Sequence, residues 1–149
     1  EHKPVFILSC ICLCSLVMLL ELSTAGWRFE SLARNLFVGV SSNTLVFLGA
    51  KHSGKILLQG EVWRLFTASW LHSGILHLGL NMLQLWQIGI PLERAYGWFR
   101  VAPLYLSAGL IGVSVSTVLL PAVISVGASA SVFGLLGAML GELLINYAC

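Results

Sequence analysis

Four long apolar segments constrain this sequence more than any other feature. They cover residues 4–20, 65–90, 99–120 and 129–149, and each is close to the roughly 20 residues that a helix needs to cross a bilayer. Only 9% of the residues are charged, whereas soluble domains carry about 25%. Because backbone groups in lipid must be paired internally, each segment is expected to be a helix. We therefore predict an all-α, polytopic transmembrane helical bundle that forms one domain over residues 1–149.

The connections between these segments differ in length. Residues 91–98 and 121–128 are expected to be short turns, whereas residues 21–64 form a much longer connection. This connection carries apolar clusters separated by single basic residues such as Arg28 and Lys51. A structureless loop of that length is uncommon in a compact domain, and the pattern is typical of short amphipathic pieces at a membrane surface. We predict a long interfacial loop over residues 21–64.

The composition excludes several classes of protein. Eight Lys and Arg stand against six acidic residues, so the chain lacks a strong basic field and we expect no nucleic-acid partner. All six acidic residues are Glu, so this chain alone cannot supply an Asp-containing triad. Cys10, Cys12 and Cys14 alternate along the first segment and do not share one helical face. We interpret them as packing residues and expect no metal and no cofactor.

A few polar side chains lie inside or beside the apolar segments, where such groups are costly and invite a functional interpretation. His77 and Asn81 are four residues apart and share a helical face, and His72 lies just before them. Ser129 opens the fourth segment. Threading four spans through a bilayer places all four side chains toward the same membrane face. Such a cluster could hold water inside a protein cavity, which hydrolysis within a membrane requires.

Structural interpretations of the same residues stay open on spacing alone. Ser129 could simply pack or bond to its own helix, and Ser131 is a rival with the same ambiguity. His77 and Asn81 could serve as interhelical hydrogen-bonding residues. Small residues also recur along the fourth segment, which indicates a closely packed neighbouring helix. These small residues are Ala130, Gly134, Gly137, Ala138 and Gly141.

Four short motifs follow one another in a specific order. They are Glu61-Val62-Trp63-Arg64, then His72-x4-His77-x3-Asn81, then PLERAYG at residues 91–97, and finally Gly127-Ala128-Ser129 with Phe133-Gly134. Together they resemble the rhomboid intramembrane serine proteases, eukaryotic members in particular. The matches cover residues 61–147, with a looser match over the first segment and the long loop. One such motif is weak evidence, whereas four in the right order are specific.

The resemblance implies catalytic roles for three residues. Ser129 would be the nucleophile, near the N-terminus of the fourth helix. His77 and Asn81 would stabilise the oxyanion together with the backbone N–H of Ser129. Preorganised donors of this kind often contribute more to catalysis than any other single effect. The family fold is a bundle of six core helices, of which the sequence contains four.

The resemblance also assigns supporting roles. His72 would support the site and its access to water, and Phe133 would pack against the catalytic imidazole. Ala130 departs from the family pattern, which usually has glycine after the serine; its methyl group could crowd the substrate or a neighbouring helix. The remaining supporting positions are Gly127 at the site and Trp63 and Arg64 as anchors of the interfacial loop.

The general base of the family is a histidine two spans further along the chain. A serine hydroxyl needs such a base to become a good nucleophile. We therefore expect the 149 residues to be an inactive four-helix fragment of a longer serine endopeptidase, whose Ser–His dyad cleaves transmembrane substrates near the lumenal or extracellular face. The alternative is an inactive rhomboid-like protein that binds and sorts membrane-protein clients.

Location and partners follow from the same resemblance. The distribution of Lys and Arg taken alone would place residues 21–64 in the cytoplasm, whereas the family topology places them on the lumenal or extracellular side, which is the orientation we expect. The protein is expected to be multi-pass, in the Golgi or the plasma membrane. Its partners would be the lipid bilayer and transmembrane protein substrates.

Overall fold

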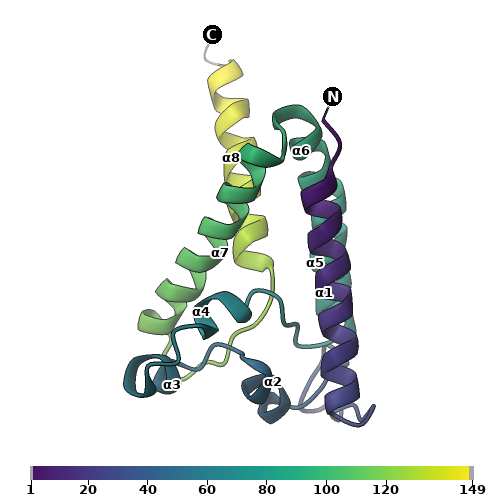
Figure 1. Ribbon diagram of the computed structural model, residues 1–149, viewed down its shortest axis with the longest axis vertical. Helices are drawn as coiled ribbons and strands as arrows, with labels where there is room; N and C mark the ends of the chain where they lie inside the picture. The colour runs from purple at the N-terminus through teal and green to yellow at the C-terminus, as the bar shows by residue number, and fades with distance from the viewer. Residues whose placement is uncertain (1, 148–149) are drawn as a thin grey trace.

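The computed structural model describes residues 2–147 and is built of helices joined by loops (Figure 1). Helices α1, α7 and α8 are each long and apolar enough to cross a membrane. This architecture confirms the predicted all-α bundle. The elements are α1 (Val5–Thr24), α2 (Ser42–Leu48), α3 (Ser53–Gln59), α4 (Arg64–Thr67), α5 (Ile75–Gln84), the π-helical segment η1 (Leu85–Gly89), α6 (Ile90–Tyr96), α7 (Trp98–Leu119) and α8 (Ser129–Tyr147).

The second apolar segment forms its helix further along the chain than the predicted residues 65–90. Helical backbone continues from α5 through η1 into α6, over residues 75–96, while residues 65–74 contain only part of α4 and a loop. The predicted turn at residues 91–98 is therefore wrong. Pro91 is the second residue of α6 and directly follows the π-helical segment η1, where the regular i→i−4 hydrogen-bond pattern is already interrupted. The helix ends instead at Gly97, whose φ of 80° favours glycine.

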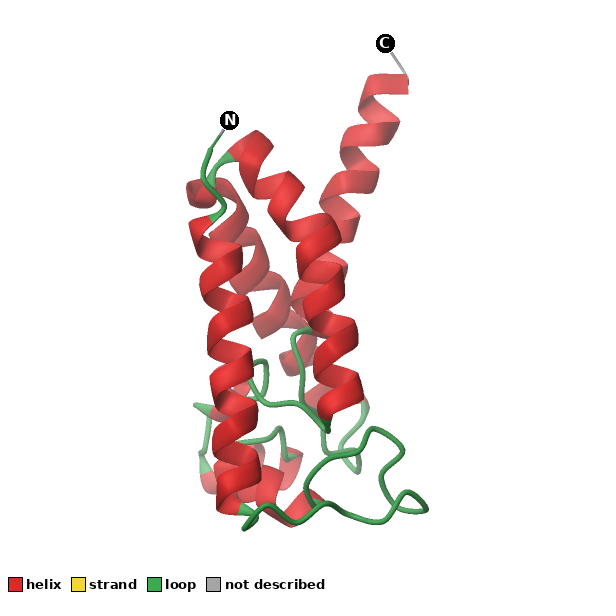
Figure 2. Cartoon of the chain, turned by 90° about the vertical axis from the view of Figure 1, so that its right-hand side faces the viewer, coloured by secondary structure: helices red, strands yellow, loops and turns green. Residues whose placement is uncertain are grey.

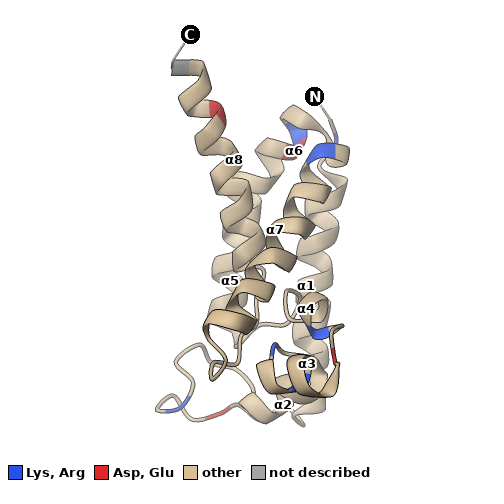
Figure 3. Cartoon of the chain, turned by 90° about the vertical axis from the view of Figure 1, so that its left-hand side faces the viewer, with Lys and Arg blue, Asp and Glu red and all other residues tan. Residues whose placement is uncertain are grey.

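The long helices run between two opposite ends of the bundle (Figures 1 and 2). The end of α1 and the short helices α2 and α3 lie at one end, and α5 and α8 begin above them, nearer the middle of the bundle. Helix α6 and the start of α7 lie at the other end. Lys, Arg and Glu residues lie mostly toward these two ends and leave the middle of the long helices uncharged (Figure 3). This distribution is what an apolar membrane interior requires.

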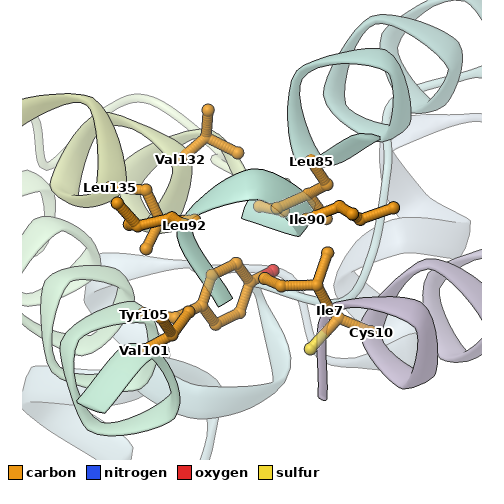
Figure 4. Close-up of a cluster of buried hydrophobic side chains, with 10 residues drawn as sticks. Ile7, Cys10, Leu85, Ile90, Leu92, Val101, Tyr105, Val132 and Leu135 are labelled. Atoms are coloured by element: carbon orange, nitrogen blue, oxygen red, sulfur yellow. The ribbon is translucent and has the colours of Figure 1, made fainter. Parts of the chain in front are cut away.

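The main hydrophobic core joins α1, η1, α6, α7 and α8 (Figure 4). Tyr105 of α7 fills its centre and is 1% exposed. Cys10 belongs to this core and Cys14 is also buried, so two of the alternating cysteines pack inside the bundle while Cys12 is exposed. The other core residues are Ile7, Leu85, Ile90, Leu92, Val101, Ala128, Val132 and Leu135.

A buried carboxylate joins the first helix to the second helical stretch. Glu93 of α6 is fully buried, and its two oxygens accept hydrogen bonds from the backbone N–H groups of Phe6 (2.9 Å) and Ile7 (2.7 Å). These N–H groups lie in the first turn of α1, where a helix has no internal acceptors and attracts negative charge. Glu93 thus caps a helix that precedes it by more than eighty residues, a contact that the sequence did not indicate.

Small residues set the closest helix contact, between α7 and α8. The methyl group of Ala130 lies against Gly112, and the methyl group of Ala108 lies against Gly134. A side chain at either glycine would collide with the opposing helix. Ser131 occupies a similar position opposite Gly109. The first half of the predicted small-residue stripe therefore meets α7, whereas nothing described lies within 4 Å of a Cβ placed at Gly137 or Gly141.

The long loop contains two short helices, α2 and α3, as its apolar clusters suggested. Lys51 lies between them and is fully buried. Its ammonium group donates to the backbone carbonyls of Leu120 (2.7 Å) and Val123 (2.8 Å), just beyond the C-terminus of α7, and burial lowers the pKa of this lysine. Its backbone also pairs with Ser125. The loop is thereby fixed to the connection that leads into α8.

Candidate functional site

The first turns of α5 carry two polar side chains of the predicted site. Asn81 is 3% exposed, and its amide nitrogen donates to the carbonyl of His77 at 2.9 Å, four residues earlier on the same helical face. This bond occupies one of the two amide N–H groups of Asn81. The amide oxygen of Asn81 is buried without a hydrogen-bond partner among the described residues. The side chain is therefore held by its own helix and keeps a second donor.

The turn before α8 brings Gly127, two residues before Ser129, against the His77 ring of α5. Gly127 has a φ of 119° and donates its N–H to the carbonyl of Ala68 at 2.9 Å. It lies directly on the His77 ring: a Cβ placed on Gly127 would be 2.6 Å from Cε1 and 3.0 Å from Nε2. Only glycine fits both the backbone conformation and this close approach. Ser129, two residues later, is half-buried as the first residue of α8.

His72 lies in the loop before α5 and is completely buried. Its ring packs edge-on against the His77 ring, with centroids 5.3 Å apart. Neither ring nitrogen meets hydrogen-bond geometry with a described residue. Its backbone N–H donates to the carboxylate of Glu21 at 2.9 Å, and Glu21 is itself buried at the end of α1. The His72 ring thus contacts the His77 ring, and Glu21 links the His72 backbone to the first helix.

Two residues at this site were not predicted from the sequence. The hydroxyl of Ser73 lies 2.8 Å from Nδ1 of His77, and its backbone N–H lies 3.4 Å from the same atom. Phe37 of the long loop also packs against the His77 imidazole, at 5.3 Å between ring centroids. The four-residue spacing from Ser73 to His77 was a usable signal. Nothing in the sequence indicated the contact with Phe37, because the long loop must fold back for it to form.

The other predicted residues of the fourth helix do not share one environment: two face α7 and one is exposed. Ser131 is 1% exposed in the α7 interface, and the Ala130 methyl group points toward Gly112 of α7. The Ala130 methyl group was expected to crowd the substrate or a neighbouring helix. It fits against α7 because Gly112 has no side chain. Phe133 is 70% exposed, and its predicted partner, the catalytic imidazole, is expected beyond Cys149. Ser131 is therefore a packing residue, whereas Ser129 is half-buried at the start of α8, two residues after Gly127.

Arg64 joins α2 to the segment before α5. Its guanidinium group is buried and donates to the carbonyls of Val46 (2.7 Å) and Ala50 (3.0 Å) at the end of α2. It also donates to the carboxylate of Glu61, and this hydrogen bond holds the pKa of Glu61 below its usual range. The guanidinium carbon lies 4.5 Å from the ring centroid of Trp63. These contacts suit the predicted role of Trp63 and Arg64 as loop anchors.

Replacing Arg64 with alanine is expected to lower the free energy of local opening of α2 by about 3 kcal/mol, because buried carbonyls and a carboxylate lose a charged donor. Native-state hydrogen exchange at the amides of Gly49 and Ala50 measures this opening. The matched control is Arg34→Ala, since Arg34 is exposed in the same loop. Unchanged protection of these amides in Arg64→Ala would contradict the anchoring role.

The close approach of Gly127 to the His77 ring brings the N-terminus of α8, which begins with Ser129, near the start of α5. The first N–H groups of α8 have no acceptor inside the helix and attract negative charge. Two imidazoles and one carboxamide lie on the adjacent face. Within residues 2–147, the structure has no cluster of three or more His, Cys, Asp or Glu side chains arranged for a metal ion. The arrangement suits stabilisation of an oxyanion beside Ser129.

A protein-family model described as "Rhomboid domain" matches residues 59–148. Among curated proteins, the chain is 50% identical over 121 residues to RHOMBOID-like protein 7 of Arabidopsis thaliana. The aligned residues cover 81% of the chain and 39% of that relative. It is 46% identical over 106 residues to rhomboid protease GluP of Bacillus subtilis, over 71% of the chain and 20% of the relative.

The chain is also 35% identical over 121 residues to inactive RHOMBOID-like protein 8 of Arabidopsis thaliana, which covers 81% of the chain and 34% of that protein. The relatives thus include one named a protease and one named inactive. The chain spans well under half the length of each of these relatives.

Proposed function

This chain belongs to the rhomboid family, and from this premise we propose that the protein acts as an intramembrane serine endopeptidase with Ser129 as its nucleophile. The family consists of integral membrane proteins, which agrees with the apolar helices α1, α7 and α8. The proposed substrates are transmembrane proteins, cut near the lumenal or extracellular face. The proposed location is the Golgi or the plasma membrane.

One observation carries the proposal: Gly127 lies against the His77 ring and so brings the start of α8 to the His77–Asn81 face. Gly127 can make this approach because it has no side chain. The proposed nucleophile and oxyanion donors then come from different helices, α8 and α5. Burial of Asn81 and His72 keeps this face shielded, and donors in a shielded site stabilise developing charge more strongly than in water.

The proposed chemistry is acyl transfer. Oγ of Ser129 attacks the carbonyl carbon of the scissile peptide bond, and its proton passes to a histidine base. The carbonyl oxygen becomes an oxyanion that accepts hydrogen bonds from His77, Asn81 and the Ser129 N–H. The bond to nitrogen breaks as the base returns the proton to the leaving amine. Water then hydrolyses the acyl-enzyme, with the same base accepting its proton, and regenerates the serine.

The proposed base is a histidine beyond Cys149. A serine hydroxyl is a weak nucleophile without such a partner. His2 follows the N-terminus, and its ring contacts Phe99 at the opposite end of the bundle. His52 accepts the N–H of Lys55 at the start of α3 in the long loop. The positions of these two imidazoles favour a base supplied from further along the chain.

A fluorophosphonate probe tests the nucleophile directly. The full-length protein in membranes is treated with a biotinylated probe and digested, and the modified peptide is identified by mass spectrometry. We expect the adduct on Ser129, because the probe reacts with activated serines. An adduct on Ser131, or no adduct on either serine, would overturn the assignment.

The second candidate is an inactive rhomboid-like protein that binds membrane-protein clients. The 35% identity to a relative named inactive is the observation in its favour. Ala130 lends it little support, because its methyl group packs against Gly112 of α7 and not toward α5. The absence of any probe adduct, together with client proteins that crosslink equally well to wild-type and Ser129→Ala protein, would favour this candidate.

A further inference from the structure

Ser73 approaches the His77 ring with two of its polar atoms. Its hydroxyl oxygen lies 2.8 Å from Nδ1, and its backbone N–H points at the same nitrogen from 3.4 Å. The hydroxyl can donate or accept, so it does not by itself decide which ring nitrogen carries the proton. The backbone N–H can only donate.

This backbone donor selects one tautomer of the imidazole. An N–H group that points at Nδ1 is favourable only when Nδ1 carries a lone pair, because a protonated Nδ1 would set two hydrogens against each other. The proton of the neutral ring then lies on Nε2. Nε2 is the ring nitrogen that faces Gly127, at 3.0 Å from a Cβ placed there. The donor of the imidazole therefore faces the turn that carries Ser129.

We propose that Ser73 is a positioning residue, which holds the His77 imidazole with Nδ1 as acceptor and Nε2–H directed toward Ser129. The inference rests on the proposed function, since it assigns the tautomer that an oxyanion donor needs. Ser73 does not touch the substrate in this scheme. It acts only through the orientation and protonation of His77.

The backbone of Ser73 is itself fixed from two directions. The side-chain amide of Asn35 donates to the Ser73 carbonyl at 2.7 Å and to the Val40 carbonyl at 3.3 Å. The preceding residue, His72, donates its N–H to Glu21 of α1. The long loop and the first helix thus converge on the peptide groups around Ser73.

The loop also holds the start of α5. Ile75 and Leu76 donate their N–H groups to the carbonyls of Val38 and Phe37, each at 3.1 Å. Gly39 and Gly74 permit this approach, because a side chain on either would collide with the opposite backbone. A hydroxyl held in this way loses little entropy when it binds the imidazole. The loop therefore contributes to the position of the His77 ring without supplying a catalytic group.

A consequence follows for the identity of the base. In this tautomer Nε2 carries a proton and cannot accept one from Ser129, while Nδ1 faces Ser73 and not Ser129. His77 is therefore a donor toward Ser129 and not its general base, which agrees with a base supplied by another histidine.

Solid-state NMR of the full-length protein in lipid bilayers, labelled with ¹⁵N-histidine, measures the tautomer without any need for activity. The variant His77→Asn identifies the His77 signals by their loss. We expect a pyridine-type Nδ1 and a pyrrole-type Nε2 in the wild-type protein and in Ser73→Thr. Ser73→Val matches threonine in shape and keeps the backbone N–H at 3.4 Å from Nδ1, but it loses the shorter hydroxyl bond of 2.8 Å, through which the hydroxyl donates to the same lone pair. The longer contact alone holds the tautomer less firmly, so a second population with a protonated Nδ1 should appear in this variant.

Steady-state kinetics give the second readout. We expect kcat of Ser73→Val to fall about tenfold relative to Ser73→Thr with KM unchanged, less than the roughly 10²–10³-fold loss for a donor removed outright, because the Ser73 N–H remains. The control is Ser107→Ala, an exposed serine on α7. A protonated Nδ1 in the wild-type protein would overturn the inference, as would a His77 tautomer and kcat that are the same in Ser73→Val and Ser73→Thr.

The two readouts separate this inference from the proposed function. If Ser129→Ala retained full activity, the proposed nucleophile would be wrong, yet the NMR spectra would still decide which nitrogen of His77 is protonated and whether Ser73 controls it. If Ser129→Ala were inactive and Ser73→Val unchanged in both readouts, the protease assignment would stand and the positioning role of Ser73 would fail.

Discussion

Replacement of Ser129 by alanine is expected to reduce cleavage of a transmembrane substrate by the full-length protein by about 10⁶-fold, to the background rate, because the acyl-enzyme can no longer form. Turnover of a fluorescent transmembrane substrate in proteoliposomes measures the effect. The fold should be unaffected, since Ser129 is half-buried and alanine is a good helix former.

Ser131→Ala is the matched control for this experiment. Ser131 lies two residues further along the same helix and packs against Gly109 of α7. Removal of its hydroxyl should leave turnover within a few-fold of wild type and change mainly the stability of the α7–α8 contact. Full activity in Ser129→Ala with loss in Ser131→Ala would reverse the assignment of the nucleophile.

Replacement of Asn81 by alanine is expected to lower kcat by about 10²–10³-fold with little change in KM, because an oxyanion donor acts in the transition state more than in substrate binding. The amide of Asn81 also donates to the His77 carbonyl, so thermal unfolding of the variant should be measured beside its kinetics. Asn146→Ala, at an exposed position near the other end of α8, is the control. An unchanged kcat in Asn81→Ala would exclude the role.

A double-mutant cycle distinguishes a shared oxyanion from two independent effects. If His77 and Asn81 bind the same oxygen, the losses in Asn81→Ala and His77→Ala should not add, because residues that act as a unit are coupled. Fully additive losses would indicate that the two side chains act separately. The cycle therefore tests the arrangement and not only the importance of each residue.

Much of this molecule follows from local patterns in the sequence. Hydropathy predicted the helical stretches, because a long apolar run must pair its backbone internally. The four-residue spacing placed His77 and Asn81 on one helical face, since helix geometry is fixed. The small residues of the fourth segment predicted a close neighbour, and α7 supplies it through Gly109, Gly112 and Ala108.

The errors arose where local pattern was a poor guide. The apolar run at residues 65–90 predicted one helix, yet its first part forms α4 and a loop. The structure shows why: carbonyls of the long loop accept the first N–H groups of α5 at Ile75 and Leu76. Pro91 was interpreted as the end of the helix, although η1 allows it to stand at the start of α6. Both boundaries depend on segments that are remote in sequence or on a rare helical geometry.

The sequence by itself determined that the chain forms apolar helices and that His77 and Asn81 share one helical face, because periodicity and hydropathy are properties of neighbouring residues. Only the tertiary structure decided that Glu93 caps α1, that Lys51 binds beyond the end of α7, and that Ser73 faces Nδ1 of His77. A hydrogen bond requires its atoms to lie within about 3 Å in the right direction. Composition does not specify these distances and directions. They are set only when the long loop and the helices have packed together.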